Sequence, residues 1–137
     1  MLDNPSSLFA LIGGADTVDS LVEAFYRHME ELPEAKEIRA MHAQDLGPTR
    51  AVLKLYLAEW LGGPTEYSAV KGHPRLRSRH MHLRIGPSER DAWLSCMNAA
   101  LEETVEDREL RAHIWENLSK LANWMRNDPG NPHDSRH

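Results

Sequence analysis

Apolar residues recur every three or four positions through most of this chain, which is the spacing of helices that bury one face. One such stretch runs from Val18 to Leu32 and ends at Pro33, a residue that cannot continue a helix. We expect Asp16 to cap the first turn of this helix. A shorter helical piece is predicted from residue 34 to residue 41.

Three further helices follow from the same spacing. Gly47-Pro48 opens the first of them, and Gly62-Gly63-Pro64 ends it. Helix returns at about Pro87, and Asp107 is predicted to start the last helix. No segment alternates between apolar and polar positions as a half-buried strand does. The chain is therefore predicted to be all-α, with four principal helices.

The segment from residue 65 to residue 87 breaks this pattern and shows little periodicity. It holds the basic residues Lys71, Arg75, Arg77 and Arg79 in a chain whose net charge is -5. Long irregular segments are uncommon in small domains unless they serve a function. The basic cluster suggests a small anionic partner, although a solvated loop explains it equally well.

The length of 137 residues suits one domain over residues 1–127, with a polar, flexible C-terminal tail over residues 128–137. The negative net charge argues against nucleic acid as a partner. No apolar run reaches the length of a membrane span, and the N-terminus has no signal-peptide pattern, so we expect a cytoplasmic protein. The single cysteine, Cys96, is predicted to be a small core residue.

Eight histidines prompt a search for a metal site, but no zinc motif is present. His80 and His82 form only a His-x-His, which is weak evidence, and His28 and His113 are expected on the surface. No phosphate-binding loop, nucleophile elbow or paired carboxylates support a nucleotide enzyme or a cofactor-free hydrolase.

Haem would explain a histidine, a basic loop and polar aromatics together, since its iron needs an axial base and its carboxylates need polar partners. Each residue also has a simpler explanation. Tyr26 could lie at a rim, Trp93 could be ordinary core, and His80 could be a loop histidine.

Several segments occur in a set order along the chain: Phe25-Tyr26, Ile38-Arg-Ala-Met-His42, Gly62-Gly-Pro, Tyr67, Gly72-His-Pro-Arg-Leu-Arg-Ser-Arg-His80 and Glu89-Arg-Asp-Ala-Trp93-Leu-Ser-Cys-Met97. Together they resemble the group II truncated haemoglobins, the 2-on-2 globins. The resemblance spans about residues 7 to 127. It implies a 2-on-2 helical sandwich around haem b, which is iron protoporphyrin IX.

The resemblance also implies roles for single residues. His80 would be the proximal iron ligand, while Tyr26, His42 and Trp93 would face the distal side where a ligand binds. The other implied cofactor contacts are Phe25, Thr49, Leu53, Leu57, Tyr67, Arg79 and Met97. Among these, Tyr67 and Arg79 would serve the haem propionates, with His73 and Arg75 as weaker candidates.

One departure from the family pattern follows the proximal histidine. His82-Leu83 stands where many relatives have Pro-Phe. This change removes an aromatic side chain from the expected haem wall, and we expect His82 to be exposed.

The three hydrogen-bond donors that the resemblance places beside the ligand, Tyr26, His42 and Trp93, should hold dioxygen tightly. Each bond is worth about 1 kcal/mol, and about 1.4 kcal/mol changes affinity ten-fold. We therefore expect a protein that binds dioxygen and other small diatomic ligands, as a monomer or weak homodimer. Because an imidazole changes charge near neutrality, His42 could make this binding depend on pH.

Tight binding implies slow release, which suits oxygen transport less well than oxygen, peroxide or nitric oxide chemistry. The alternative function is thus a haem redox enzyme, peroxidase-like or a nitric oxide dioxygenase, which would need an external electron donor. A third possibility is a helical interaction module that binds no cofactor.

Overall fold

The computed structural model describes residues 7–42, 44–71 and 86–125, and all regular secondary structure within these ranges is helical. The principal helices are α2 (Ala15–Glu31), α4 (Gly47–Trp60), α7 (Pro87–Thr104) and α8 (Arg108–Met125). The short elements are α1 (Leu8–Leu11), the 3-10 turn η1 (Pro33–Ala35), α3 (Lys36–Ala40) and α5 (Glu66–Lys71). The predicted all-α class with four principal helices is confirmed.

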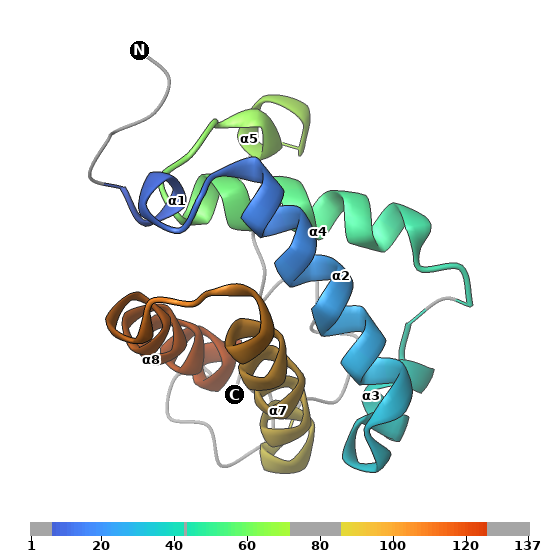
Figure 1. Cartoon of the computed structure of the whole chain (residues 1–137). Helices are drawn as coiled ribbons and strands as arrows, with labels where there is room; N and C mark the ends of the chain where they lie inside the picture. Colours follow the sequence, from blue (N-terminus) through green and yellow to red (C-terminus); the bar gives the residue numbers. More distant parts are fainter. Residues whose placement is uncertain (1–6, 43, 72–85, 126–137) are drawn as a thin grey trace.

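The four principal helices form two pairs. α2 packs against α4, and α7 packs against α8. Figure 1 shows α2 crossing α4 in the upper part of the molecule, with α7 and α8 beneath them. α2 also packs closely on α7, whereas α4 has no comparable packing against α7 or α8 in the described part of the chain. α2 is therefore the helix that joins the two pairs.

The core lies between the pairs and is built from one face of each helix. α2 contributes Leu21, Val22, Phe25 and Met29, α7 contributes Cys96, Met97 and Leu101, and α8 contributes Ile114 and Leu118. All of these side chains are buried, as their helical spacing predicts. Cys96 is fully buried, which confirms its prediction as a core residue.

The helices begin and end at the residues that the sequence predicts, with one exception. α2 begins at Ala15 with Gly14 as its N-cap, so the prediction that Asp16 caps this helix is wrong. Gly14 has a φ of 75°, which favours glycine, and Asp16 lies inside the first turn. A carboxylate there still interacts favourably with the positive end of the helix.

The other boundaries agree with the sequence. Gly62 has a φ of 95° and directly follows the C-cap of α4. Asp107 precedes α8, and its carboxylate accepts hydrogen bonds from the backbone N–H groups of Glu109 and Leu110 at 2.9 and 3.1 Å. This arrangement confirms Asp107 as the start signal of the last helix. The predicted tail lies outside the described residues and stays a prediction.

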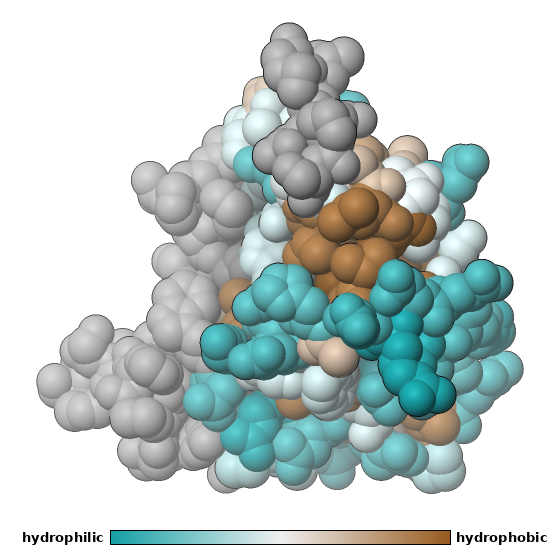
Figure 2. All heavy atoms as spheres, turned by 60° about the vertical axis from the view of Figure 1, so that its left-hand side comes forward, coloured by the Kyte–Doolittle hydropathy of each residue, from teal (hydrophilic) through white to brown (hydrophobic). Residues whose placement is uncertain are grey.

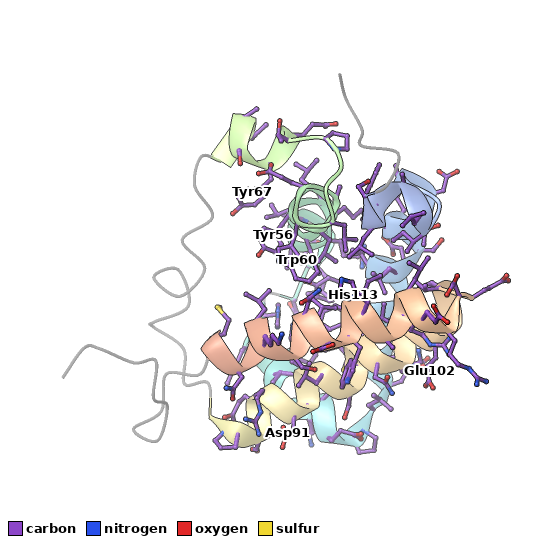
Figure 3. The ribbon with its side chains drawn as sticks, turned by 90° about the vertical axis from the view of Figure 1, so that its left-hand side faces the viewer. Tyr56, Trp60, Tyr67, Asp91, Glu102 and His113 are labelled. Atoms are coloured by element: carbon purple, nitrogen blue, oxygen red, sulfur yellow. The ribbon has the colours of Figure 1, made fainter. Side chains whose placement is uncertain are left out.

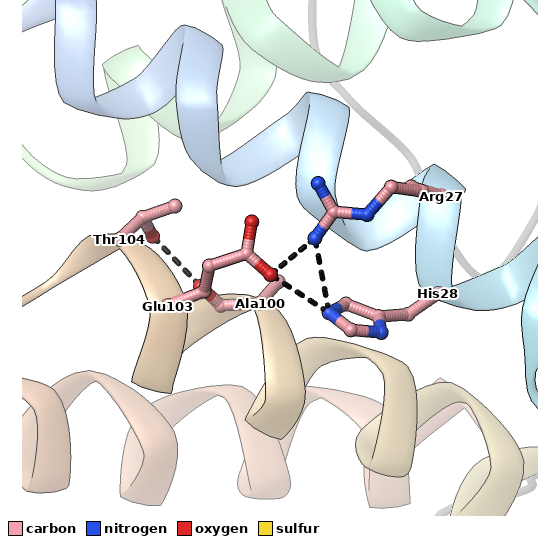
Figure 4. A network of polar contacts seen from close by, with 5 residues as sticks. All are labelled: Arg27, His28, Ala100, Glu103 and Thr104. Atoms are coloured by element: carbon pink, nitrogen blue, oxygen red, sulfur yellow. Dashed lines mark hydrogen bonds and ion pairs between the residues drawn. The ribbon is translucent and has the colours of Figure 1, made fainter.

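A polar contact joins α2 to α7 at the surface (Figure 4). The Glu103 carboxylate pairs with Arg27 and lies 3.1 Å from Nε2 of His28. These hydrogen bonds favour the charged carboxylate and lower the pKa of Glu103. His28 is thus partly exposed and engaged with Glu103, while His113 is exposed on α8.

Figure 2 shows a face that is largely polar, with one apolar patch on it. Leu11 at the end of α1 has 53% of its surface exposed. No helix in the described ranges is long and apolar enough to cross a membrane. A single exposed apolar side chain such as Leu11 is normal on a protein surface and identifies no partner.

Candidate functional site

Four aromatic rings form a continuous row between the two helix pairs. Phe25 of α2 contacts the ring of Trp93 on α7, with centroids 5.4 Å apart. Its neighbour Tyr26 lies 4.9 Å from Phe25 and 6.0 Å from the His42 ring. All three contacts are edge-to-face, the geometry that aromatic pairs prefer. The structure therefore brings together Tyr26, His42 and Trp93, which the sequence resemblance assigned to one distal site.

Tyr26 combines deep burial with a polar group that has no partner. Its exposed fraction is 5%, and its hydroxyl makes no hydrogen bond to any residue that the structure describes. Burial raises the pKa of Tyr26 to about 12, while the charge of Arg50 acts in the opposite direction. The phenol is therefore neutral and able to donate a hydrogen bond at physiological pH.

His42 is held by the backbone just before it. Its Nδ1 lies 2.7 Å from the carbonyl oxygen of Ile38. Since a carbonyl can only accept, Nδ1 must carry the hydrogen, and the neutral ring keeps a lone pair on Nε2. The single N–H of neutral His42 is thus engaged with Ile38, and the free nitrogen donates only when the ring is protonated.

The helix α4 presents the next predicted contacts. Thr49, Leu53 and Leu57 are four residues apart, so they share one face of α4. Leu57 is buried, Leu53 packs partly buried against the core, and Thr49 is partly exposed. Met97, one turn beyond Trp93 on α7, is fully buried. These side chains supply the apolar character that a flat cofactor would need.

Tyr67 lies apart from the aromatic row, on the short helix α5. Its ring contacts Tyr56 of α4 edge-to-face, with centroids 5.5 Å apart. Figure 3 shows Tyr56 and Tyr67 on the same side of α4, with Trp60 below that helix toward α8. Only 3% of Tyr67 is exposed, and its hydroxyl has no hydrogen-bond partner among the described residues.

These features together fit a haem. A buried hydroxyl normally has a hydrogen-bond partner, yet Tyr26 and Tyr67 both lack one within the described ranges. A haem with a polar ligand on one face and two propionates at its edge would provide such partners. Within the described ranges α4 has no close packing against α7 or α8, which is compatible with a further group between the pairs. The described residues contain no cluster of three metal-binding side chains.

Five candidates from the sequence lie outside the described residues. They are the iron ligand His80, its neighbour His82, and the proposed propionate partners His73, Arg75 and Arg79. Their roles stay predictions, as does the effect of the His82-Leu83 departure.

Three features of the site were not predicted from the sequence: the bond of His42 to the Ile38 carbonyl, the ring contact of Tyr56 with Tyr67, and the charge of Arg50 near Tyr26. Tyr56 was not among the predicted site residues. Its contact with Tyr67 crosses the turn between α4 and α5, and helical periodicity gives no information on such pairs. Arg50 follows Thr49 directly, but only the packing of α4 on α2 brings it near Tyr26.

Comparison with protein families identifies a related group. The model of the family described as "Bacterial-like globin" matches residues 7–127. A curated relative, the group 2 truncated hemoglobin YjbI of Bacillus subtilis, is 35% identical over 114 residues. That alignment covers 83% of this chain and 84% of the relative.

Solved structures of similar proteins have the same fold. A group II 2-on-2 hemoglobin from Agrobacterium tumefaciens is 44% identical with a TM-score of 0.87, covering 93% of this chain and 98% of its own. A cold-adapted truncated hemoglobin from Pseudoalteromonas haloplanktis is 34% identical with a TM-score of 0.88, covering 90% of this chain and 99% of its own. The 2-on-2 architecture that the sequence resemblance implies is thus confirmed.

Proposed function

This chain belongs to the bacterial-like globin family, and on that premise we propose that it binds haem b through His80 and dioxygen on the side of Tyr26, His42 and Trp93. Membership of the truncated haemoglobins implies haem and small diatomic ligands. The choice of iron ligand, of distal residues and of dioxygen goes further than the family and constitutes the proposal.

The observation that carries the proposal is the buried hydroxyl of Tyr26, which has no hydrogen-bond partner among the residues that the structure describes, on a ring that contacts both Phe25 and His42. An unsatisfied buried hydroxyl costs about 1–3 kcal/mol. A hydrogen-bond acceptor beside Tyr26 removes this cost. A diatomic ligand that gains partial negative charge is a strong acceptor, so the protein selects a ligand of that kind.

The other residues divide the remaining tasks. His80 would hold the haem, whose iron would supply the binding of a diatomic ligand. Trp93 offers its indole N–H as a second donor, while Leu53, Leu57 and Met97 exclude water. Tyr67 and Arg79 would hold the propionates, the former through its buried hydroxyl.

An absorption spectrum of the purified protein loaded with haem tests the first half of the proposal. We expect a Soret band and a His-ligated ferrous spectrum, lost or strongly altered in His80→Ala. His82→Ala and His113→Ala are matched controls that remove a histidine while keeping that spectrum. A ligand change in His82→Ala instead would move the iron to that neighbour and refute the assignment of His80.

The dioxygen dissociation rate tests the second half. Loss of one donor is worth a factor of about five to ten, so Tyr26→Phe and Trp93→Phe should each release dioxygen faster by about that factor. Unchanged rates in both variants would refute the donor network. Rapid turnover of peroxide or nitric oxide with an added reductant would indicate a redox enzyme instead of a binding protein.

A further inference from the structure

The short helix α5 depends on α4 for its position. No other described element packs against α5 to a similar extent. Two contacts fix it, and both start from the same face of α4, since Tyr56 and Glu59 are three residues apart. They reach consecutive residues of α5, Tyr67 and Ser68. A shift or rotation of α5 would therefore break both contacts together.

The Glu59 contact is the polar one. One carboxylate oxygen of Glu59 accepts the backbone N–H of Ser68 at 2.9 Å, and the other accepts the Ser68 hydroxyl. These two bonds lower the pKa of Glu59, because they favour the charged carboxylate. A carboxylate that holds both the backbone and the side chain of one residue fixes the orientation of that residue.

Tyr67, which precedes Ser68, has a buried hydroxyl that lacks a hydrogen-bond partner among the described residues. Its ring lies against Tyr56. The direction of that hydroxyl follows from the orientation of α5, because the helix is short and the ring is enclosed. Because Glu59 fixes the orientation of Ser68, it also determines the direction of the Tyr67 hydroxyl.

We propose that Glu59 is a positioning residue for the haem, which acts through Ser68 to present the Tyr67 hydroxyl to a haem propionate. This inference rests on the proposed function and deepens it. It assigns to an otherwise ordinary surface carboxylate an effect on cofactor retention. It also explains why the two hydrogen bonds between Glu59 and Ser68 lie directly beside the buried Tyr67; we call these two bonds the clamp.

The rate of haem release to an excess of apomyoglobin measures the effect. Tyr67→Phe loses one hydrogen bond to the cofactor, which corresponds to about five-fold faster release. We expect Glu59→Ala to raise the rate about three-fold, and Ser68→Ala, which keeps the backbone donor, about two-fold. Both substitutions should have no further effect in the Tyr67→Phe background, because they act through that hydroxyl. The propionate bending mode in the resonance Raman spectrum should shift alike in Glu59→Ala and Tyr67→Phe.

Glu102→Ala is the matched control. Glu102 is an exposed carboxylate on α7, with no hydrogen bond or ion pair among the described residues, and it lies far from Tyr67 in Figure 3. Its removal changes the net charge equally and should leave haem release unchanged.

Three results would overturn the inference. Unchanged release in Glu59→Ala and Ser68→Ala would show that the clamp does not act on the cofactor. Additive effects with Tyr67→Phe would show a general loss of stability. Both results leave the proposed function intact if the parent keeps its His80-ligated spectrum, whereas a parent that takes up no haem would refute both proposals.

Discussion

At the scale of single residues, the ionisation of Tyr26 decides when the distal donor is available. Tyr26 is closed off by Phe25 and His42, and burial raises the pKa of Tyr26 to about 12. A tyrosine in water has a pKa of about 10 and is half ionised at that pH. With a pKa of about 12, only roughly one Tyr26 in a hundred is ionised at pH 10.

We therefore expect the contribution of Tyr26 to dioxygen binding to be constant up to pH 10. The ratio of dissociation rates between Tyr26→Phe and the parent, about five to ten, should be the same at pH 7 and pH 10. Stopped-flow measurement of dioxygen release gives this ratio. His113→Phe, which changes an exposed residue of α8 outside the aromatic row, should not alter the rates. A ratio that falls clearly between pH 9 and pH 10 would show that Tyr26 ionises as in water, because half of the tyrosine would then be ionised at pH 10.

His42 should contribute less to dioxygen retention than Tyr26. Its Nδ1–H is engaged with the Ile38 carbonyl, and the other nitrogen of the neutral ring can only accept a hydrogen bond. We therefore expect His42→Phe to change the dioxygen dissociation rate by less than about two-fold, whereas Tyr26→Phe should change it by about five-fold or more. Stopped-flow measurement compares the two variants, with His113→Phe as the control on an exposed histidine. Release as fast from His42→Phe as from Tyr26→Phe would show that the His42 ring also donates to the ligand.

At this scale, the grouping of the distal residues was predictable from the resemblance, whereas their hydrogen bonding was not; their roles toward a ligand stay predictions. The resemblance grouped Tyr26, His42 and Trp93, and the ring contacts agree with that grouping. The tautomer of His42 could not be predicted, because it depends on a backbone carbonyl one turn earlier. The burial of Tyr67 could not be predicted either, since it results from the packing of α5 onto α4.

At the scale of helices, the cap of α8 gives a quantitative test. The Asp107 carboxylate accepts two backbone N–H groups of the first turn, and loss of such a cap costs about 1 kcal/mol. We expect Asp107→Ala to lower the midpoint of thermal unfolding by about 3–5 °C. Glu106→Ala, which removes the neighbouring exposed carboxylate, should change the midpoint by less than about 1 °C. Equal effects of the two substitutions would indicate a general response to charge and contradict the capping role.

Helix boundaries were largely predictable because their signals are local. Pro33, Pro48 and Asp107 act on the turn in which they lie, and the structure confirms all three. The start of α2 was not predicted correctly, since Gly14 at positive φ replaces the expected aspartate cap. A polar residue near a helix start does not show which of several positions becomes the cap when glycines precede it.

At the scale of the whole molecule, the arrangement of the helices is compatible with a cofactor between the two pairs. Periodicity predicts four amphipathic helices, but their 2-on-2 arrangement was implied by the family resemblance alone. In the structure α2 joins the pairs, while α4 has no comparable packing on α7 or α8 in the described ranges. A haem bound between the pairs would bury further apolar side chains, so we expect haem binding to raise folding stability.

This linkage predicts that one substitution has opposite effects with and without haem. Tyr67 is buried, with no hydroxyl partner among the described residues. Without haem the hydroxyl would also lose its proposed propionate partner, so Tyr67→Phe should then leave stability unchanged or raise it by about 1 kcal/mol. In the holoprotein the same change removes a bond to the cofactor and should lower stability by a similar amount. Urea unfolding of both forms measures the two effects. Asp107→Ala is the control, because a cap remote from the haem should destabilise both forms equally. Destabilisation of the apoprotein by Tyr67→Phe would mean that the protein itself satisfies this hydroxyl, and the propionate assignment of Tyr67 would fail.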